Sequence, residues 1–146
     1  MLSARTDVVG SLLRPPELLE ALERHQRGEL GDAEFKRIED RAVDDAIALQ
    51  EDAGLEVVTD GELRRLSFQS QLPASADGFS EWTLDAFLWG EWHSDELGDV
   101  ALDRPPIAVV GKLRRRRLPS VEELSYARGR TDRILKITVP SPSLYA

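Results

Sequence analysis

The sequence predicts an α/β fold in which about four parallel strands are covered by helices. Apolar segments that favour strands alternate with helical segments along the 146 residues. Each strand segment is apolar at consecutive positions, which is typical of parallel strands buried on both faces. Two architectures fit this pattern: an open doubly wound sheet and an eight-stranded α/β barrel. A complete barrel needs about 250 residues, so this chain can supply only part of one.

The first strand and the first helix are expected near the N-terminus. Residues 6–11, TDVVGS, form a β-branched run and predict a buried strand that breaks at Gly10. The following PPELLEALERHQRG predicts a helix, because proline is tolerated in a first helical turn and Gly28 provides a C-terminal stop.

The second helix has the clearest pattern. Asp32 is a favourable N-cap, and Gly54 provides the stop. Between them, apolar residues recur at intervals of three or four, which places them in one stripe along the helix. The stripe consists of Phe35, Ile38, Ala42, Ala46, Leu49 and Ala53.

Three further strands and one helix are expected. LEVVTDGE (55–62) is the second strand, PPIAVVGKL (105–113) the third, and ILKITVPSPS (134–143) the fourth. Ser120 and Glu123 have capping-box spacing and predict a helix through SVEELSYARGR. A parallel half-sheet of this length would leave an apolar edge uncovered. We therefore expect either a truncated piece or a second chain that completes the fold.

The region from 66 to 104 does not fit the alternation and is interpreted as a long insertion after the second strand. It contains all three tryptophans, and its Trp-rich part spans about 79–93. Long loops at the carboxyl ends of strands often form lids or substrate walls. Tryptophans in such a segment nevertheless fill a small core more often than they stack on a ligand.

Composition and charge exclude several classes of function. The chain has 27 acidic and 19 basic residues and a net charge of −8, whereas broad nucleic-acid binding requires a cationic face. It has no cysteine, so it forms no disulfide and no thiolate metal site. No apolar run is long enough for a signal peptide or a membrane span. We expect a cytoplasmic protein that binds neither nucleic acid nor membrane.

The candidate site residues lie where the expected strands end, because parallel α/β folds bind ligands at the carboxyl ends of their strands. Gly10 lets backbone N–H groups approach an anion, and Ser11 adds a hydroxyl donor. Asp60 and Glu62 follow the second strand, and Glu62 can accept hydrogen bonds from an ammonium group. Donors for a carboxylate beside an acceptor for an amine predict a substrate site for an amino acid.

Each of these signals also has a structural interpretation. Gly-Ser and Asp-Gly are common turn dipeptides, and the two carboxylates with Arg64 and Arg65 also fit a solvated surface cluster. His25 is expected to be solvated, and His93 to be structural or exposed rather than a metal ligand. The arginine run 114–117 is interpreted as a solvated loop, with binding of a polyanionic tail or a partner chain as the alternative.

Four blocks of the sequence together resemble a known family. They are DVVGSLLRPPELLEA, IALQEDAGLEVVTDGELRR, VVGKL and LKITVPSPSL. In this order they are similar to the N-terminal half of the catalytic-domain family of cobalamin-independent methionine synthase. That family also includes shorter methionine-synthase-like proteins and epoxyalkane:coenzyme M transferase. The patterns VGS-x-x-RP and Q-x-x-AG-x-x-x-x-TDGE are the most specific, and the insertion has no match.

The resemblance implies the first half of a TIM-type (β/α)8 barrel over residues 1–146, with the insertion at about 66–104. It also implies a transferase in which zinc activates a thiol. The thiolate attacks an alkyl donor, which is 5-methyltetrahydrofolate in the methionine synthases. By motif matching, Gly10 and Ser11 correspond to residues that bind the carboxylate of homocysteine. Glu62 corresponds to a residue that binds its amino group.

The zinc ligands of this family are a histidine, two cysteines and a glutamate on later barrel strands. We therefore expect zinc in the completed enzyme only, with no metal ligand and no catalytic residue in this chain. Three hypotheses follow: a subunit of a split enzyme whose second chain supplies the zinc site, an inactive fragment, or a noncatalytic module that binds an amino acid or a partner. The thiol substrate and the folate-type or other alkyl donor stay open, because the insertion would lie at the pocket mouth.

Overall fold

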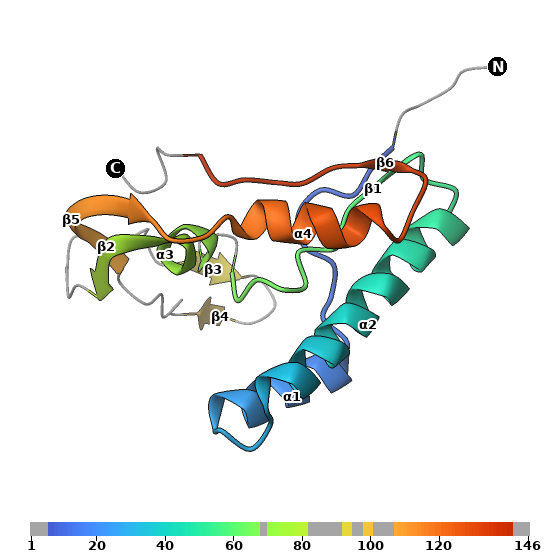
Figure 1. Cartoon of the computed structure of the whole chain (residues 1–146). Helices are drawn as coiled ribbons and strands as arrows, with labels where there is room; N and C mark the ends of the chain where they lie inside the picture. Colours follow the sequence, from blue (N-terminus) through green and yellow to red (C-terminus); the bar gives the residue numbers. More distant parts are fainter. Residues whose placement is uncertain (1–5, 68–69, 82–91, 95–97, 101–106, 142–146) are drawn as a thin grey trace.

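The computed structural model of the chain describes residues 6–67, 70–81, 92–94, 98–100 and 107–141. Figure 1 shows the elements in chain order. They are α1 (Pro16–Gln26), α2 (Asp32–Asp52), β1 (Val57–Val58), α3 (Gln71–Ser75), β2 (Ala76–Glu81), β3 (Trp92–Ser94), β4 (Gly98–Val100), β5 (Ile107–Arg115), α4 (Pro119–Arg128) and β6 (Ile134–Leu135).

A parallel strand pair confirms that the fold is α/β. β1 pairs with β6, with Val57 opposite Ile134 and Val58 opposite Leu135. The long crossover between them includes α4, as parallel pairing requires. The other sheets are antiparallel pairs, β2 with β5 and β3 with β4. Because the described residues form a single parallel pair, the half-barrel and the insertion at 66–104 stay predictions.

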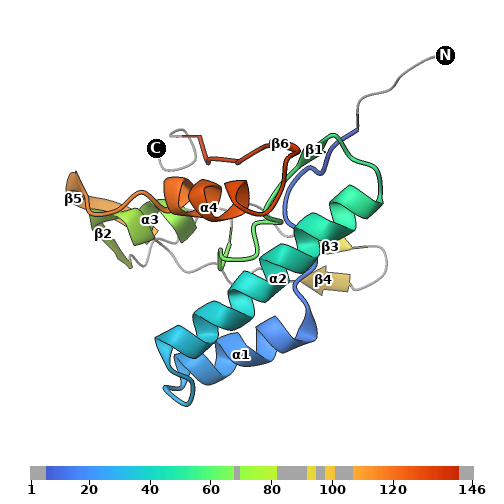
Figure 2. The same cartoon turned by 45° about the vertical axis from the view of Figure 1, so that its right-hand side comes forward.

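The long helix α2 contributes most of the core and contacts α1 and α4 (Figure 2). Leu18 of α1 and Ala127 of α4 pack in the same cluster as its buried side chains. The buried residues of α2 are Ala42, Val43, Ala46, Ile47 and Gln50. Leu49, which is 64% exposed, and Ala53 lie outside this face, so the predicted stripe is wrong at these two positions. A helix with neighbours on two sides buries adjacent positions, and one stripe cannot describe both contacts.

The ends of the first two helices lie close to their predicted positions. α1 begins at Pro16, and Gly28 follows its last turn. The cap of α2 is the extended residue Gly31, and no side chain caps this end, so the predicted N-cap Asp32 is instead the first helical residue. Gly54 follows the C-cap with a φ of +79°, as expected for a helix stop.

The predicted capping box of α4 is wrong. Leu118 is the N-cap and the helix has no side-chain cap. Ser120 Oγ instead donates to Gln71 Oε1 at 3.2 Å. The Glu123 carboxylate accepts hydrogen bonds from Arg65 at 2.8 and 3.2 Å. A buried guanidinium is a stronger partner for a carboxylate than a helix-end N–H group. Glu123 therefore bonds Arg65 instead of capping α4.

Residues 6–11 are extended but are not a strand, contrary to the prediction. Val9 is 90% exposed, whereas a buried strand was expected. The segment runs beside β1 and β6 (Figure 1), where the Lys136 ammonium donates to the Asp7 carboxylate and to the carbonyl oxygen of Val8. A β-branched run favours extended backbone but does not by itself create a ladder of hydrogen bonds.

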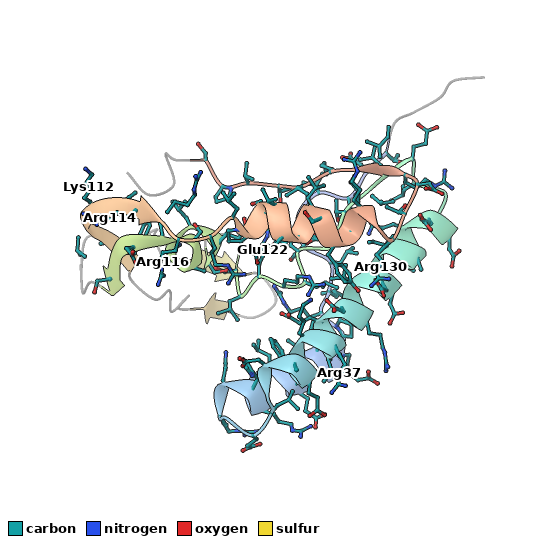
Figure 3. The ribbon with its side chains drawn as sticks, in the orientation of Figure 1. Arg37, Lys112, Arg114, Arg116, Glu122 and Arg130 are labelled. Carbon is teal, nitrogen blue, oxygen red and sulfur yellow. The ribbon has the colours of Figure 1, made fainter. Side chains whose placement is uncertain are left out.

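The third predicted strand exists as β5 but has a different partner. It pairs antiparallel with β2 and forms a two-stranded ribbon instead of joining the parallel pair. Gly111 is exposed, and Figure 3 places Lys112 and Arg114 at the end of this ribbon, away from α1 and α2. The expectation that the third strand joins the parallel strands is therefore wrong. An apolar run identifies a strand but not its partner.

The arginine run 114–117 is exposed, as expected, but Arg114 and Arg115 lie in β5 and not in a loop. Arg116 Nε lies 3.1 Å from Asp77 Oδ1, and Arg117 pairs with Glu122. In Figure 3, Arg116 is labelled near β2 and Glu122 is labelled at α4. The run contributes ion pairs with the ribbon and with α4, which favours the interpretation of a solvated surface.

Part of the expected insertion cannot be compared with the prediction. Trp82 and Trp89 lie outside the described residues, as does most of the Trp-rich segment. The described residues of this region form α3, β2, β3 and β4. In the part of the chain that the structure describes, no helix combines the length and the apolar character needed to cross a bilayer.

We expect replacement of Val43 by alanine to destabilise the fold. Val43 is fully buried between α1 and α4 neighbours, so losing two carbons should lower the free energy of unfolding by about 2 kcal/mol. Urea denaturation followed by circular dichroism measures this change.

Leu49→Ala is the matched control, because Leu49 lies on the same helix but is exposed. It should change the free energy of unfolding by less than about 0.5 kcal/mol. Equal losses for the two variants would contradict the position of the core described above.

Candidate functional site

One pocket, of about 490 Å³, brings together three of the predicted site residues. Gly10 and Ser11 come from the N-terminal segment, and Glu62 comes from the turn after β1. Their role in substrate binding stays a prediction, but their common location was expected from the sequence. The complete lining consists of Val9, Gly10, Ser11, Arg14, Glu62, Arg65, Ser67, Thr138 and Val139.

The turn that follows β1 directs Glu62 into this pocket. Gly61 and Glu62 both have left-handed backbone, with φ of +71° and +54°. Such a conformation is unfavourable by about 1–3 kcal/mol for a residue other than glycine. Two side chains hold it: Thr59 Oγ1 accepts from the Gly61 N–H and Asp60 Oδ1 accepts from the Glu62 N–H, both at 3.0 Å. The Leu12 N–H donates to the Gly61 carbonyl at 3.0 Å and ties the N-terminal segment to the turn.

Gln50 of α2 supports the turn from behind. Its side-chain amide donates to the Thr59 carbonyl and accepts from the Thr59 N–H, each at 2.9 Å. The same Nε2 also donates to the Ala46 carbonyl at 2.8 Å. These bonds satisfy the backbone of Thr59 where the strand pairing has ended. The signal for Gln50 in the sequence was a polar residue on the apolar side of a helix.

Asp60 has a different position from the other predicted site residues. It is 2% exposed and does not line the pocket. Its Oδ1 holds the Glu62 N–H, and within the described residues its Oδ2 has no hydrogen-bond partner. Burial raises the pKa of Asp60 above its usual 3.8. Its geometry therefore fits a residue that forms the turn rather than one that contacts a ligand.

Arg65 joins the pocket to two distant segments. It is 3% exposed, so the alternative interpretation as a solvated cation is wrong. Its guanidinium forms two hydrogen bonds to Glu123 of α4, and two more to Thr138, at 3.0 Å to Oγ1 and 2.8 Å to the carbonyl. Arg65 Nη1 also lies 3.5 Å from Glu62 Oε2. The sequence offered no signal that separates Arg65 from the other arginines.

Arg14 is a second cation on the pocket wall that sequence analysis did not assign to the site. Its guanidinium donates to the backbone carbonyls of Glu62, at 3.4 Å, and of Arg65. Among the described residues no carboxylate pairs with Arg14. The motif VGS-x-x-RP contains Arg14 as well as the donors Gly10 and Ser11, and all three line the pocket.

Arg64 and His25 have structural positions outside this pocket. Arg64 pairs with Glu39 and Asp40 of α2, and its guanidinium lies 4.5 Å from the ring centre of Tyr126. The His25 ring stacks on Phe35 at 4.5 Å, and its Nδ1 lies 3.0 Å from the Leu30 carbonyl. The expectation that His25 is solvated is therefore wrong. The backbone of His93 lies in β3, and its side chain is outside the description.

The pocket residues do not fit a zinc ion. Its one carboxylate, Glu62, already accepts a hydrogen bond from Thr138 and faces the Arg65 guanidinium. The chain has no cysteine, and no three His, Asp or Glu side chains of the described residues are grouped so that they could hold a metal. The two cationic side chains in the lining, Arg14 and Arg65, would also repel a zinc ion. No step that depends on zinc can be assigned to these residues.

The chain is similar in sequence to bacterial proteins along nearly all its length. No protein-family model matches it. It is 29% identical over 141 residues to the uncharacterized protein YxjG of Bacillus subtilis, covering 96% of this chain and 35% of that protein. It is 29% identical over 137 residues to 5-methyltetrahydropteroyltriglutamate–homocysteine methyltransferase of Streptococcus mutans, covering 94% of this chain and 17% of that protein.

Two solved structures share the fold. A putative vitamin-B12-independent methionine synthase from Listeria monocytogenes superposes with a TM-score of 0.66 and 25% identity, over 93% of this chain and 36% of that one. A B12-independent methionine synthase from a Shewanella species gives a TM-score of 0.64 over 94% of this chain and 38% of that one, and its 22% identity supports the fold alone. The chain thus spans less than two fifths of each of these relatives.

Replacing Asp60 with asparagine should flatten the dependence of stability on pH. Because burial raises the pKa of Asp60 above 3.8, the folded state binds this proton more tightly than the unfolded state does. The contribution of Asp60 to the free energy of unfolding therefore falls as the pH rises from below 3.8 through the raised pKa. Asparagine keeps the oxygen that accepts from Glu62 but removes the charge. Urea denaturation of both proteins between about pH 3.5 and about pH 7 measures the difference.

Asp45→Asn is the control for the loss of one carboxylate, because Asp45 is exposed on α2. A stability difference between wild type and Asp60→Asn that stays constant over this pH range, or that changes in wild type's favour as the pH rises, would contradict the effect of burial.

Proposed function

We propose that this chain, a homologue of the cobalamin-independent methionine synthases over nearly its whole length, supplies the amino-acid pocket of a related alkyl- or methyltransferase. The ligand is an α-amino acid with a thiol side chain, such as homocysteine. The alkyl donor is of the folate type or an analogue. The chain's own share of the reaction is to bind and orient the amino acid.

The observation that carries this proposal is the buried carboxylate of Glu62. Glu62 is 5% exposed and lines the pocket. Two buried carboxylates, Glu62 and Glu123, share the single guanidinium of Arg65, which bonds Glu123 at 2.8 Å but lies 3.5 Å from Glu62. The Glu62 carboxylate is therefore only weakly neutralised, because the Arg65 guanidinium bonds Glu123 and the Arg14 guanidinium bonds backbone carbonyls. A ligand ammonium group would compensate it, because a buried charge without a partner is unfavourable.

The N-terminal part of the pocket lining suits the carboxylate of the same ligand. Gly10, with φ +80°, turns the backbone there, and Ser11 adds a hydroxyl. Within the described residues, the N–H and the Oγ of Ser11 make no hydrogen bond, so both can donate to a ligand. Arg14 contributes a positive charge. Hydrogen-bond donors and a carboxylate in one lining match the two charged groups of an amino acid.

The rest of the enzyme is proposed to come from outside this chain. Residues 1–146 would form the first half of a (β/α)8 barrel, with the insertion at about 66–104. A second chain, or a further part of the protein, would complete the barrel and supply zinc. What supports this arrangement is the pocket lining, which contains charged side chains, while no group of the described residues could hold a metal ion.

Replacement of Glu62 by glutamine is the most direct test. It keeps the shape of the side chain and its acceptor oxygen but removes the charge. We expect the affinity for L-methionine, used as a stable thioether probe, to fall by about tenfold to a hundredfold, the scale of a hydrogen bond to a charged group. An NMR titration of the chain measures it.

Glu56→Gln serves as the control, because Glu56 is exposed just before β1. It should leave the affinity unchanged. Unchanged binding by Glu62→Gln with an intact circular dichroism spectrum would refute the proposed site.

A second prediction concerns the assembly. The tagged chain, purified from the organism that encodes it, should elute as a complex with a second polypeptide, and the complex should contain zinc by elemental analysis. The chain alone should contain none. A zinc-free monomer that binds the amino acid would instead support a noncatalytic module, and a monomer that binds nothing would support an inactive fragment.

A further inference from the structure

The hydroxyl group of Thr138 lies between two buried charged side chains. Arg65 Nη1 donates to Thr138 Oγ1 at 3.0 Å, and Thr138 Oγ1 donates to Glu62 Oε1 at 2.6 Å. A guanidinium can only donate, so the direction of both bonds is determined. The chain of bonds runs from Arg65 through Thr138 to the Glu62 carboxylate.

This hydroxyl is the principal contact that positions the Glu62 carboxylate. Among the described residues, Thr138 makes the only hydrogen bond to it. The other neighbour is Arg65, whose Nη1 is 3.5 Å from Glu62 Oε2, a distance that permits attraction but not a good hydrogen bond. Without the hydroxyl, the carboxylate would be free to close on the guanidinium.

Thr138 is itself held at this place by the backbone. Its carbonyl accepts from Arg65 Nη2 at 2.8 Å. Two residues earlier, the Lys136 N–H donates to the Val58 carbonyl at 2.9 Å and extends the pairing of β1 with β6. A β-branched side chain has few rotamers, so a fixed backbone also determines where its hydroxyl points.

From these contacts we propose that Thr138 is a positioning residue that keeps the Glu62 carboxylate apart from Arg65 and available to a ligand amine. The inference rests on the proposed function, because it assigns the selectivity of the same pocket. Thr138 thereby determines that the pocket prefers a ligand with an amino group over the same ligand without one. Its hydroxyl occupies one side of the carboxylate and leaves the remaining acceptor positions for the ammonium.

The test compares two ligands in five proteins: wild type, Thr138→Val, Thr138→Ser, Glu62→Gln and the double variant Glu62→Gln with Thr138→Val. L-methionine carries the amino group, and 4-(methylthio)butanoate is the same molecule without it. Wild type should bind L-methionine at least about tenfold more tightly. Thr138→Val keeps the shape but removes the hydroxyl; it should lose that preference while its affinity for 4-(methylthio)butanoate stays within about twofold. Thr138→Ser should restore the preference. In the Glu62→Gln background, Thr138→Val should cause no further loss.

The outcomes separate the inference from the function on which it rests. Wild type without any preference for L-methionine would overturn the proposed function and this inference together. A wild-type preference that survives in Thr138→Val, or an equal loss for both ligands, would overturn the inference alone, because a purely structural role affects both ligands. If Thr138→Val does not fold, Thr138→Ala compared with Thr138→Ser gives the same contrast between absence and presence of the hydroxyl.

Discussion

The buried guanidinium of Arg65 is the interaction on which the arrangement of this protein depends. It joins the turn after β1 to α4 through Glu123, and to the segment after β6 through Thr138. A buried ion pair adds little net stability, yet removal of one partner costs about 3–5 kcal/mol because the other charge is left buried. The contact therefore works mainly as an organising constraint. It requires three segments far apart in the sequence to meet at one point.

The pocket is a consequence of this meeting. Its walls come from the N-terminal segment with Gly10 and Ser11, from the turn with Glu62, and from Thr138 near the other end of the described chain. It can form only after β6 has docked beside β1. The left-handed backbone of Glu62 also shapes the pocket. Hydrogen bonds from the turn to Asp60 and Gln50 stabilise this unfavourable conformation, which directs the Glu62 carboxylate into the pocket.

The similarity to the larger methionine synthases covers nearly all of this chain but only a fraction of their length. The charges of the pocket suit the two ends of an amino acid and not a metal ion. Substrate binding and metal chemistry would thus be carried by separate parts of such an enzyme. This division is consistent with a chain whose described pocket is lined by charged side chains and whose sequence has no cysteine.

Local sequence patterns were sufficient to predict α1, α2 and α4 and the positions of β1 and β6, because periodicity and terminal glycines or prolines act within a few residues. Both strands are only two residues long, whereas strands over 55–62 and 134–143 were expected, so their predicted extent is wrong. Local patterns also predicted that Gly10, Ser11 and Glu62 lie close together, although residues 6–11 are not a strand and the hydrogen bond from Leu12 to Gly61 holds them at the turn. Such local patterns did not predict which strands pair or which polar side chains are buried. The pairing of β5 with β2, the coil at 6–11, and the burial of Arg65 and Gln50 depend on contacts across the whole chain. Arg64 and Arg65 are adjacent and chemically identical. In the folded protein, Arg64 pairs with Asp40 on α2, whereas Arg65 bonds Glu123 and Thr138 beside the pocket. Only the tertiary positions of these partners separate the two arginines.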